Sequence, residues 1–300
     1  MVNKNHVTKN NKKVAVITGC SSGIGFETSL LLARNGFYTY ATMRNPEESK
    51  KGILAVAKRE KLFLQVIPLD VTDARSVKDA IKKIIKEQKR IDILVNNAGY
   101  LLLGSLEELS ITEVAEQFET NFFGVIRVTQ AVLPIMRKQR QGTIVNISSI
   151  AGRMGFPVSS AYVSSKFALE GLSESISYEL EQFGIKVILI EPGITKTNFG
   201  NKFKIGKRVA RNYVRHSSAN SAYTKMTQNR IAGFKPRFES GSPALEVADI
   251  ILKSIMTNNP DLRYLVGTDA LKIMDIREKI PNKDFRKLVM DSVIYHRKKK

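Results

Sequence analysis

The sequence predicts a single-domain α/β fold whose core is a doubly wound, parallel sheet of seven strands with helices on both faces. Two observations predict it. Short runs rich in β-branched and aromatic residues alternate with longer segments of helical periodicity along most of the 300 residues, an alternation typical of a parallel sheet with crossover helices. A glycine-rich turn also separates the first strand-like run from the first helical segment, as in open α/β sheets that bind ligands at their strand ends.

The elements follow one another in a regular order. Apolar runs bounded by turn residues predict seven strands, namely VAVIT (14–18), FYTYATM (37–43), LFLQVIPLD (62–70), IDILVNNAG (91–99), GTIVNIS (142–148), KVILIEPG (186–193) and DLRYLVG (261–267). Helical periodicity predicts helices at about 24–35, 48–60, 74–90, 112–138, 160–183 and 245–258. Right-handed crossovers bring the carboxyl ends of the strands to one edge, and the motifs described below lie at those ends.

Composition and charge limit the class of protein. With 43% hydrophobic and 25% charged residues the chain can bury a full core, and its only cysteine, Cys20, leaves no pair for an intrachain disulfide. The start MVNKNHVTKNNKK is polar and basic, and no run of 18 apolar residues occurs, so we expect a cytoplasmic protein without a signal peptide or transmembrane helix. The net charge of +20 predicts non-specific attraction to nucleic acid or anionic membranes.

Tyr162 and Lys166 stand four residues apart in SAYVSSK, a spacing that places a phenol and an ammonium on one helix face. A nearby cation favours the phenolate and lowers the tyrosine pKa from about 10. A tyrosine tuned in this way can act as a general acid or base. A Y-x-x-x-K match alone more often means a packed ring beside a solvated lysine, because so short a pattern is common by chance. The remaining motifs reverse those odds.

The run VAVITGCSSGIG (14–25) reads as a strand, a phosphate loop and the start of a helix. Glycine permits positive φ and close backbone approach, and the following helix offers unpaired N–H groups and a positive dipole end to a pyrophosphate. The spacing G-x-x-x-G-x-G of Gly19, Gly23 and Gly25 differs from the G-x-G-x-x-G fingerprint and alone could be an ordinary turn. Its place at the start of a βαβ pattern favours a dinucleotide site.

Six motifs occur in a recognisable order: the glycine loop, NNAG (96–99), NFFG (121–124), ISS ending at Ser149, the Tyr–Lys pair and EPG (191–193). Together they resemble the classical short-chain dehydrogenase/reductase family closely over about residues 12–200, with a compatible layout to about 267. The resemblance implies a Rossmann fold, a nicotinamide cofactor, interconversion of a carbonyl and an alcohol, and a homodimer or homotetramer formed through two long helices. The sequence looks most like hydroxysteroid and retinol dehydrogenases, with 3-oxoacyl-carrier-protein reductases as the alternative.

The resemblance also implies a catalytic role for four residues. Ser149 holds the substrate carbonyl and Tyr162 gives it a proton, while hydride comes from the cofactor. Lys166 lowers the tyrosine pKa and binds the nicotinamide ribose. Asn121 matches the residue that holds a water linking Lys166 to solvent. Ser148 is one position away from the family spacing and is expected to face elsewhere.

For the cofactor, the residue after the second strand indicates NADP(H), with NAD(H) as the alternative. Met43 stands where NAD-dependent members place an acid, and Arg44 can bind a 2′-phosphate through two N–H donors unless it is merely a solvated loop residue. Asp70 matches the residue that holds the adenine amino group. The alternative is that Asp70 caps the helix that begins near Ala74, although Asp73 is better placed for that task. The implied cofactor residues are Gly19, Ser21, Ser22, Gly23, Ile24, Gly25, Arg44, Asp70, Val71, Asn97, Ala98, Gly99, Tyr162, Lys166, Pro192, Gly193, Thr195 and Thr197.

The layout divides the chain into a flexible basic tail (1–12), the dehydrogenase domain (13–267) and a basic helical C-terminal extension (268–300). Within the domain, about 198–243 is the expected substrate lid. The lid is basic, with Phe199, Phe203 and Tyr213 among the charges, which suits a hydrophobic carbonyl compound with or without an acidic group. A solvated pair of amphipathic helices is an equal alternative. In the family layout the residues expected to line an apolar pocket are Leu101, Leu102, Leu103, Met154 and Phe156.

Two other classes of function are weighed against this interpretation. The sequence has no G-x-S-x-G elbow, and its three histidines, His6, His216 and His296, lie in the tails or the variable segment. Both observations argue against hydrolysis by a serine–histidine pair. No histidine, cysteine or aspartate cluster has metal-ligand spacing. A cofactor-sensing protein, or one associated with nucleic acid or membranes, could keep the fold without turnover. The complete set of Ser149, Tyr162 and Lys166 argues against it.

Overall fold

A computed structural model describes residues 12–197, 203–214 and 222–294 of the chain. The seven expected strands form one sheet in the order β11-β7-β6-β4-β1-β2-β3, and every neighbouring pair is parallel. Their bounds are β1 (Val14–Ile17), β2 (Tyr38–Met43), β3 (Leu64–Pro68), β4 (Ile93–Asn96), β6 (Gly142–Ile147), β7 (Ile185–Pro192) and β11 (Arg263–Val266). The predicted doubly wound parallel sheet is therefore confirmed.

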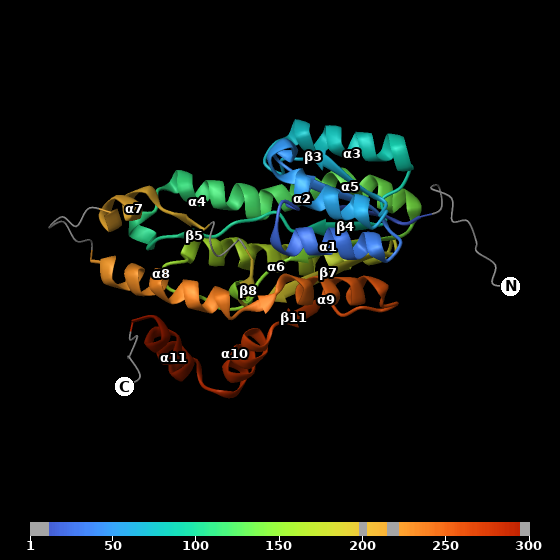
Figure 1. Ribbon diagram of the computed structural model, residues 1–300. Helices are drawn as coiled ribbons and strands as arrows, with labels where there is room; N and C mark the ends of the chain where they lie inside the picture. The colour runs from blue at the N-terminus through green and yellow to red at the C-terminus, as the bar shows by residue number, and fades with distance from the viewer. Residues whose placement is uncertain (1–11, 198–202, 215–221, 295–300) are drawn as a thin grey trace.

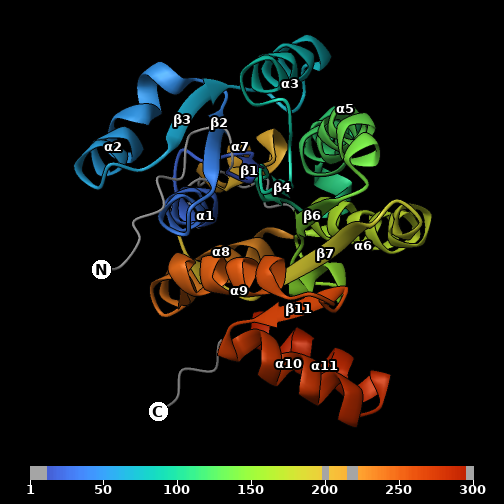
Figure 2. The ribbon, with the colours of Figure 1, turned by 90° about the vertical axis from the view of Figure 1, so that its right-hand side faces the viewer.

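Helices cover both faces of this sheet (Figure 2). On one face lie α1 (Gly23–Arg34), α2 (Pro46–Arg59) and α9 (Ala244–Met256), and on the other lie α3 (Ala74–Gln88), α5 (Gly124–Gln139) and α6 (Ser160–Glu181). The side chains of β1 point alternately to the two faces of the sheet. Ala15 and Ile17 join the core on the face covered by α1, α2 and α9, and Val14 and Val16 join the core on the other face. A strand buried on both faces explains the continuous apolar run in the sequence.

The long helix expected at 112–138 is interrupted. It divides into α4 (Ile111–Phe118), a π-helical turn (Glu119–Phe123) and α5. Ser110 and Glu113 form a capping box at the start of α4, which fixes where it begins. A π-helical turn accommodates one extra residue and is frequent at functional sites. Asn121 lies in this turn.

Beyond the carboxyl edge of the sheet, short strands tie the later part of the chain to the earlier part (Figure 1). β5 (Leu102–Leu103) pairs with β9 (Lys204–Ile205), and β8 (Thr195–Lys196) pairs with β10 (Ser242–Pro243). Between β9 and β10 run α7 (Lys207–Val214) and α8 (Thr224–Glu239). Single 3-10 turns occur at Leu106–Glu108 and Ile150–Gly152.

The chain continues after β11 into α10 (Thr268–Lys279) and α11 (Asn282–Ile294). Met274 and Phe285 from these helices are buried in one cluster with Met154, and α11 contacts α8. In Figure 1 the pair lies below α8 and α9. Among the described residues, no helix has the length and apolar character needed to cross a membrane.

Candidate active site

The predicted site residues converge on one cavity of about 1340 Å³ at the carboxyl edge of the sheet. All the predicted catalytic and cofactor residues line this cavity except Asn121 and Gly25. Gly25 lies directly beneath the glycine loop, and Asn121 lies behind the segment that follows β4. The convergence brings together motifs spread over more than half of the chain.

The glycine loop between β1 and α1 is closely packed against the segment after β4. Gly19 has φ of +73°, and a Cβ there would lie 2.8 Å from Ala98 Cα. A Cβ on Gly25 would lie 2.5 Å from Asn97 Nδ2. At the N-terminus of α1, Ser22 makes no side-chain capping bond and the first turn has no acidic residue. Backbone N–H groups and the helix dipole thus favour an anion here, and the loop fits the pyrophosphate of a dinucleotide.

Thr18 holds this loop in place, a role that no sequence motif indicated. Its hydroxyl oxygen accepts hydrogen bonds from Asn97 N and Ala98 N, both at 3.0 Å. Asn97 Nδ2 donates in turn to Thr18 O at 2.8 Å and to Gly19 O at 3.1 Å. The bonds span 78 to 80 residues of sequence. Only the threonine's position next to the glycine turn could have pointed to it.

Two charged residues lie at the far end of the cavity from α11. Arg44 follows β2 and is exposed at the cavity wall. Asp70 Oδ1 accepts hydrogen bonds from Thr72 N at 2.9 Å and Thr72 Oγ1 at 2.8 Å. Asp73, not Asp70, caps α3, because its side chain accepts from the N–H groups of Arg75 and Ser76. Asp70 therefore remains available on the cavity wall.

Ser149, Tyr162 and Lys166 meet where β6 ends and α6 begins. Ser149 Oγ accepts a hydrogen bond from Ala151 N at 3.1 Å, and a hydrogen bond joins Ser149 to the Tyr162 phenol. Lys166 Nζ donates to Ile147 O at 2.7 Å and lies 5.8 Å from the centre of the Tyr162 ring. The helical spacing of four thus places the ammonium against the sheet, beside the phenol.

The electrostatics of this group differ from the sequence-based expectation. Burial raises the pKa of Tyr162 to about 12, and the bond with Ser149 opposes this only in part. Burial also lowers the pKa of Lys166 to about 8, against the opposing charge of Glu170. The expected lowering of the tyrosine pKa by Lys166 is therefore not found, because desolvation disfavours both charged forms. The protein without cofactor holds a protonated phenol next to a readily titrated lysine.

Asn121 is buried and joins two elements of the site. Its Oδ1 accepts from Tyr100 N at 3.1 Å, and its Nδ2 donates to Tyr100 O at 3.0 Å and Ser165 Oγ at 3.3 Å. The π-helical turn presents this side chain between the segment after β4 and α6. The amide therefore fixes the backbone next to Gly99 relative to the helix that carries Tyr162 and Lys166.

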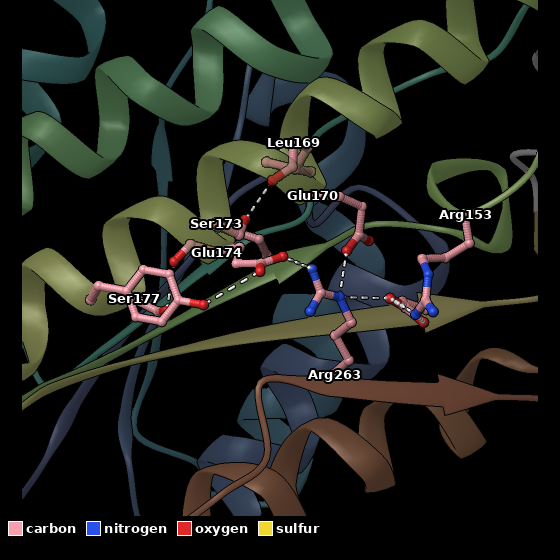
Figure 3. A network of polar contacts seen from close by, with 10 residues as sticks. Arg153, Leu169, Glu170, Ser173, Glu174, Ser177 and Arg263 are labelled. Atoms are coloured by element: carbon pink, nitrogen blue, oxygen red, sulfur yellow. Dashed lines mark hydrogen bonds and ion pairs between the residues drawn. The ribbon is translucent and has the colours of Figure 1, made fainter.

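An ion-pair network lies behind α6, the helix that carries Tyr162 and Lys166 (Figure 3). Arg263 of β11 contacts Glu170 at 3.0 Å and Glu174 at 2.6 Å, and Arg153 contacts the fully buried Glu191 at 3.1 Å. Burial and the nearby charge of Glu170 raise the pKa of Glu191 to about 6. No sequence motif indicated this network, because residues that are bonded in it are up to 93 positions apart. It joins α6 to β7 and β11.

The end of the cavity near α8, α10 and α11 is lined by both apolar and basic side chains. Leu101, Met154 and Phe156 line it as expected, but Leu102 and Leu103 do not. Leu102 faces the opposite side and is buried in another cluster, whereas Leu103 is buried in the same cluster as Leu101. Further lining residues come from α8, α10 and α11, namely Arg230, Arg237, Phe238, Ile273, Leu288 and Val289. Ser148, expected to face elsewhere, is buried but also lines the cavity beside Ser149. Phe199 and the three histidines lie outside the described residues.

Comparison with known proteins now assigns the family. The family described as short chain dehydrogenase matches residues 13–208. The uncharacterized oxidoreductase YusZ of Bacillus subtilis is 40% identical over 273 residues, covering 90% of this chain and 95% of YusZ. Retinol dehydrogenase 8 of Bos taurus is 38% identical over 282 residues, covering 88% and 86%. The chain belongs to the short-chain dehydrogenase/reductase family of oxidoreductases.

Solved structures agree with the fold. A short-chain dehydrogenase/reductase from Burkholderia phymatum in complex with NAD has a TM-score of 0.76 at 23% identity, covering 91% of this chain and 95% of that one. ElxO with NADP bound has a TM-score of 0.68 at 30% identity, covering 87% and 99%. The first of these structures contains NAD and the second contains NADP.

Proposed function

We propose that this protein is an NADP(H)-dependent oxidoreductase that interconverts a carbonyl and an alcohol on a hydrophobic small molecule. The observation that carries the proposal is the meeting of Ser149, Tyr162 and Lys166 on the wall of the cavity that the glycine loop also lines. Reduction needs a group that gives a proton to the carbonyl oxygen. Tyr162 carries a proton at neutral pH beside the Ser149 hydroxyl, and the nearby Lys166 ammonium favours the phenolate that is left when this proton is given up.

The proposed roles follow from what each side chain reaches. Ser149 and Tyr162 hold the carbonyl oxygen by hydrogen bonds, and Tyr162 donates the proton. Lys166 stabilises the phenolate that forms when Tyr162 gives up its proton. Asn121 fixes the backbone at Tyr100, next to the site. A bound nicotinamide supplies the hydride. The glycine loop, Asp70, Val71, Asn97–Gly99, Pro192, Gly193, Thr195 and Thr197 would hold that cofactor.

The preference for NADP(H) over NAD(H) rests on the end of β2. Arg44 is exposed on the cavity wall directly after Met43, where an acidic residue would oppose a 2′-phosphate. A guanidinium can bind that phosphate through two parallel hydrogen bonds.

We further propose that about 198–243 is the substrate lid, that 268–300 is a basic helical extension, and that residues 1–12 form a basic tail. The apolar side chains of α8, α10 and α11 on the cavity support a hydrophobic substrate. A cytoplasmic location and a homodimer or homotetramer are part of the same proposal. The oligomer is supported by exposed aromatic side chains beside α5 and on α6.

The test is oxidation of NADPH and NADH by the purified protein against steroids, retinal, quinones, ketones and aldehydes, with Tyr162→Phe in parallel. We expect turnover selective for NADPH and at least about 10²-fold lower kcat in Tyr162→Phe, because the proton donor is lost. Undiminished turnover in Tyr162→Phe would contradict the assigned role. Tight NADPH binding without turnover of any compound would favour a sensing protein.

A further inference from the structure

Lys166 and Glu170 are charged side chains that lie one helical turn apart on α6. Both residues are buried, with 7% and 5% of their surface exposed. Lys166 Nζ donates a hydrogen bond to Ile147 O of β6, and Glu170 Oε2 accepts one from Arg263 Nε of β11 at 3.0 Å. An ammonium and a carboxylate thus lie on the sheet side of one helix, at a spacing at which opposite charges attract.

Glu170 also packs against the turn that carries Ser149. Gly152 N donates a hydrogen bond to Ser149 O at 2.8 Å and closes this turn. A Cβ on Gly152 would lie 2.9 Å from Glu170 Cγ and 2.8 Å from Ser148 Oγ. The absence of a side chain at this position therefore lets Glu170 approach the backbone behind the two serines. Glu170 lies between the helix of Lys166 and the turn of Ser149.

Arg263 lies among three carboxylates and holds Glu170 in this place (Figure 3). Its Nε lies 3.0 Å from Glu170 Oε2 and 3.5 Å from Glu191 Oε1. Its Nη2 lies 2.6 Å from Glu174 Oε2. A guanidinium shared in this way balances the charge of Glu170 only in part, and the carboxylate still raises the pKa of Lys166 against the effect of burial.

The other charged groups around α6 act elsewhere. On the elements packed against it, and on the turn after Ser149, they are Glu113, Glu116, Glu119, Arg153, Lys186 and Glu191. Ion pairs or hydrogen bonds to backbone hold five of them, and Glu116 raises the pKa of the Tyr100 phenol. Tyr162, on α6 itself, is neutral at pH 7. Among the described groups, Glu170 is the one whose charge shifts the pKa of Lys166.

We propose that Glu170 is a positioning residue for the reaction, whose carboxylate keeps Lys166 in the ammonium form that the Tyr162 phenolate requires, and that Arg263 moderates this effect. The inference rests on the proposed function, because the charge of Lys166 matters for turnover only if Tyr162 donates the proton. Loss of the negative charge at Glu170 would let Lys166 lose its proton at lower pH. Loss of the positive charge at Arg263 would act in the opposite direction.

The activity test compares pH profiles of kcat for NADPH-dependent reduction of the fastest-reduced compound among the steroids, retinal, quinones, ketones and aldehydes. Glu170→Gln keeps an oxygen that can accept from Arg263 and removes only the charge. We expect its alkaline midpoint to move about one pH unit lower, with kcat on the acidic side within about threefold of wild type. In Arg263→Gln the midpoint should move to higher pH.

Glu174→Gln is the matched control for this test. Glu174 binds the same arginine, but it is 45% exposed and lies two helical turns from Lys166. Solvent screens a charge at such a position, so the midpoint should move by less than about 0.3 pH units. Glu170→Asp, which keeps the charge, should lie closer to the wild-type profile than Glu170→Gln.

A direct titration separates this inference from the proposed function. In protein labelled with 13C at lysine Cε, the NMR signal of Lys166 is identified by its loss in Lys166→Met. Without cofactor we expect a midpoint near pH 8 in the wild-type protein, about one pH unit lower in Glu170→Gln and higher in Arg263→Gln. These shifts without turnover of any compound would overturn only the proposed reaction.

Two results would overturn the role of Glu170 and leave the reductase intact. The first is an unchanged Lys166 midpoint in Glu170→Gln. The second is an equal loss of kcat at every pH, which would mark Glu170 as a structural residue. Because the two charge-removing variants are expected to act in opposite directions, a shift of the same sign in both would also contradict the proposal.

Discussion

Burial acts on both members of the Tyr162–Lys166 pair in the direction of the neutral form. The tyrosine pKa rises to about 12 and the lysine pKa falls to about 8. Glu170, one helical turn beyond Lys166, opposes the second shift and is itself held by Arg263 at 3.0 Å. The network behind α6 therefore contributes to the charge of the lysine as well as to its position.

Lys166→Met tests the energetic consequence. Because the folded pKa lies at about 8 rather than 10.5, the unfolded chain binds more protons between these pH values, and the unfolding free energy rises with pH there. From pH 7 to 9 this contribution amounts to about 1 kcal/mol in the wild-type protein. In Lys166→Met it should vanish, and the unfolding free energy at pH 7 should increase by about 1–3 kcal/mol after loss of the bond to Ile147.

Urea unfolding of both proteins without cofactor at pH 7, 8 and 9 measures this difference. The difference between the two curves isolates Lys166 from other titrating groups. Lys82→Met, at an exposed position of α3, is the matched control and should run parallel to the wild-type protein. Parallel curves for Lys166→Met as well would show that the buried lysine carries no such cost.

At the scale of single elements, the π-helical turn shows where sequence patterns lose information. The apolar periodicity of 112–138 predicts one continuous helix, since one inserted residue hardly changes an average over seven turns. In the structure that residue belongs to Glu119–Phe123, where Asn121 reaches Tyr100 and Ser165. The motif indicated that Asn121 was functional, but only the fold shows how it is presented.

The C-terminal helices are a second element whose place in the fold could not be predicted from the sequence pattern. The sequence predicts a basic helical extension after residue 267 but does not show where it packs. Phe285 of α11 is only 6% exposed and packs with Met154 and Met274, so the described part of the segment is docked. Met154 also lines the cavity, which connects α11 to the substrate wall.

Phe285→Ala should therefore affect substrate binding as well as stability. Loss of a buried phenylalanine costs about 3–5 kcal/mol in a core, and the edge position of α11 places this site at the lower end. We expect a higher KM for apolar substrates with an unchanged Kd for NADPH, because the glycine loop lies on other elements. Steady-state kinetics and thermal unfolding check this. The exposed neighbour Lys283→Ala should alter neither, and an unchanged KM in Phe285→Ala would separate α11 from the substrate wall.

For the whole molecule, features encoded within a few consecutive residues could be predicted, whereas contacts between distant segments could not. Each strand and the glycine loop are coded within a few residues, so the seven-stranded sheet and the edge that carries the site followed from the sequence. The walls of the cavity combine distant segments, and Arg263 finds Glu170 across 93 residues. No spacing rule connects such partners. For the same reason Arg230 was part of a basic lid in the sequence but is a buried side chain in the fold.

The remaining exposed apolar surface bears on assembly. Phe123 of the π-helical turn is 46% exposed and Phe167 of α6 is 45% exposed, and both lie in the segments proposed to form the subunit interface. Phe167→Asp would place a charge within such an interface, where an unpaired charge costs several kcal/mol. We expect the wild-type protein to sediment as a dimer or tetramer and Phe167→Asp as a smaller species. Leu271→Asp, at a 54% exposed position of α10, is the control and should keep the wild-type mass. A wild-type mass retained in Phe167→Asp would exclude α6 from the interface, whereas dissociation with the site still able to bind NADPH would show that each subunit carries a complete cofactor site.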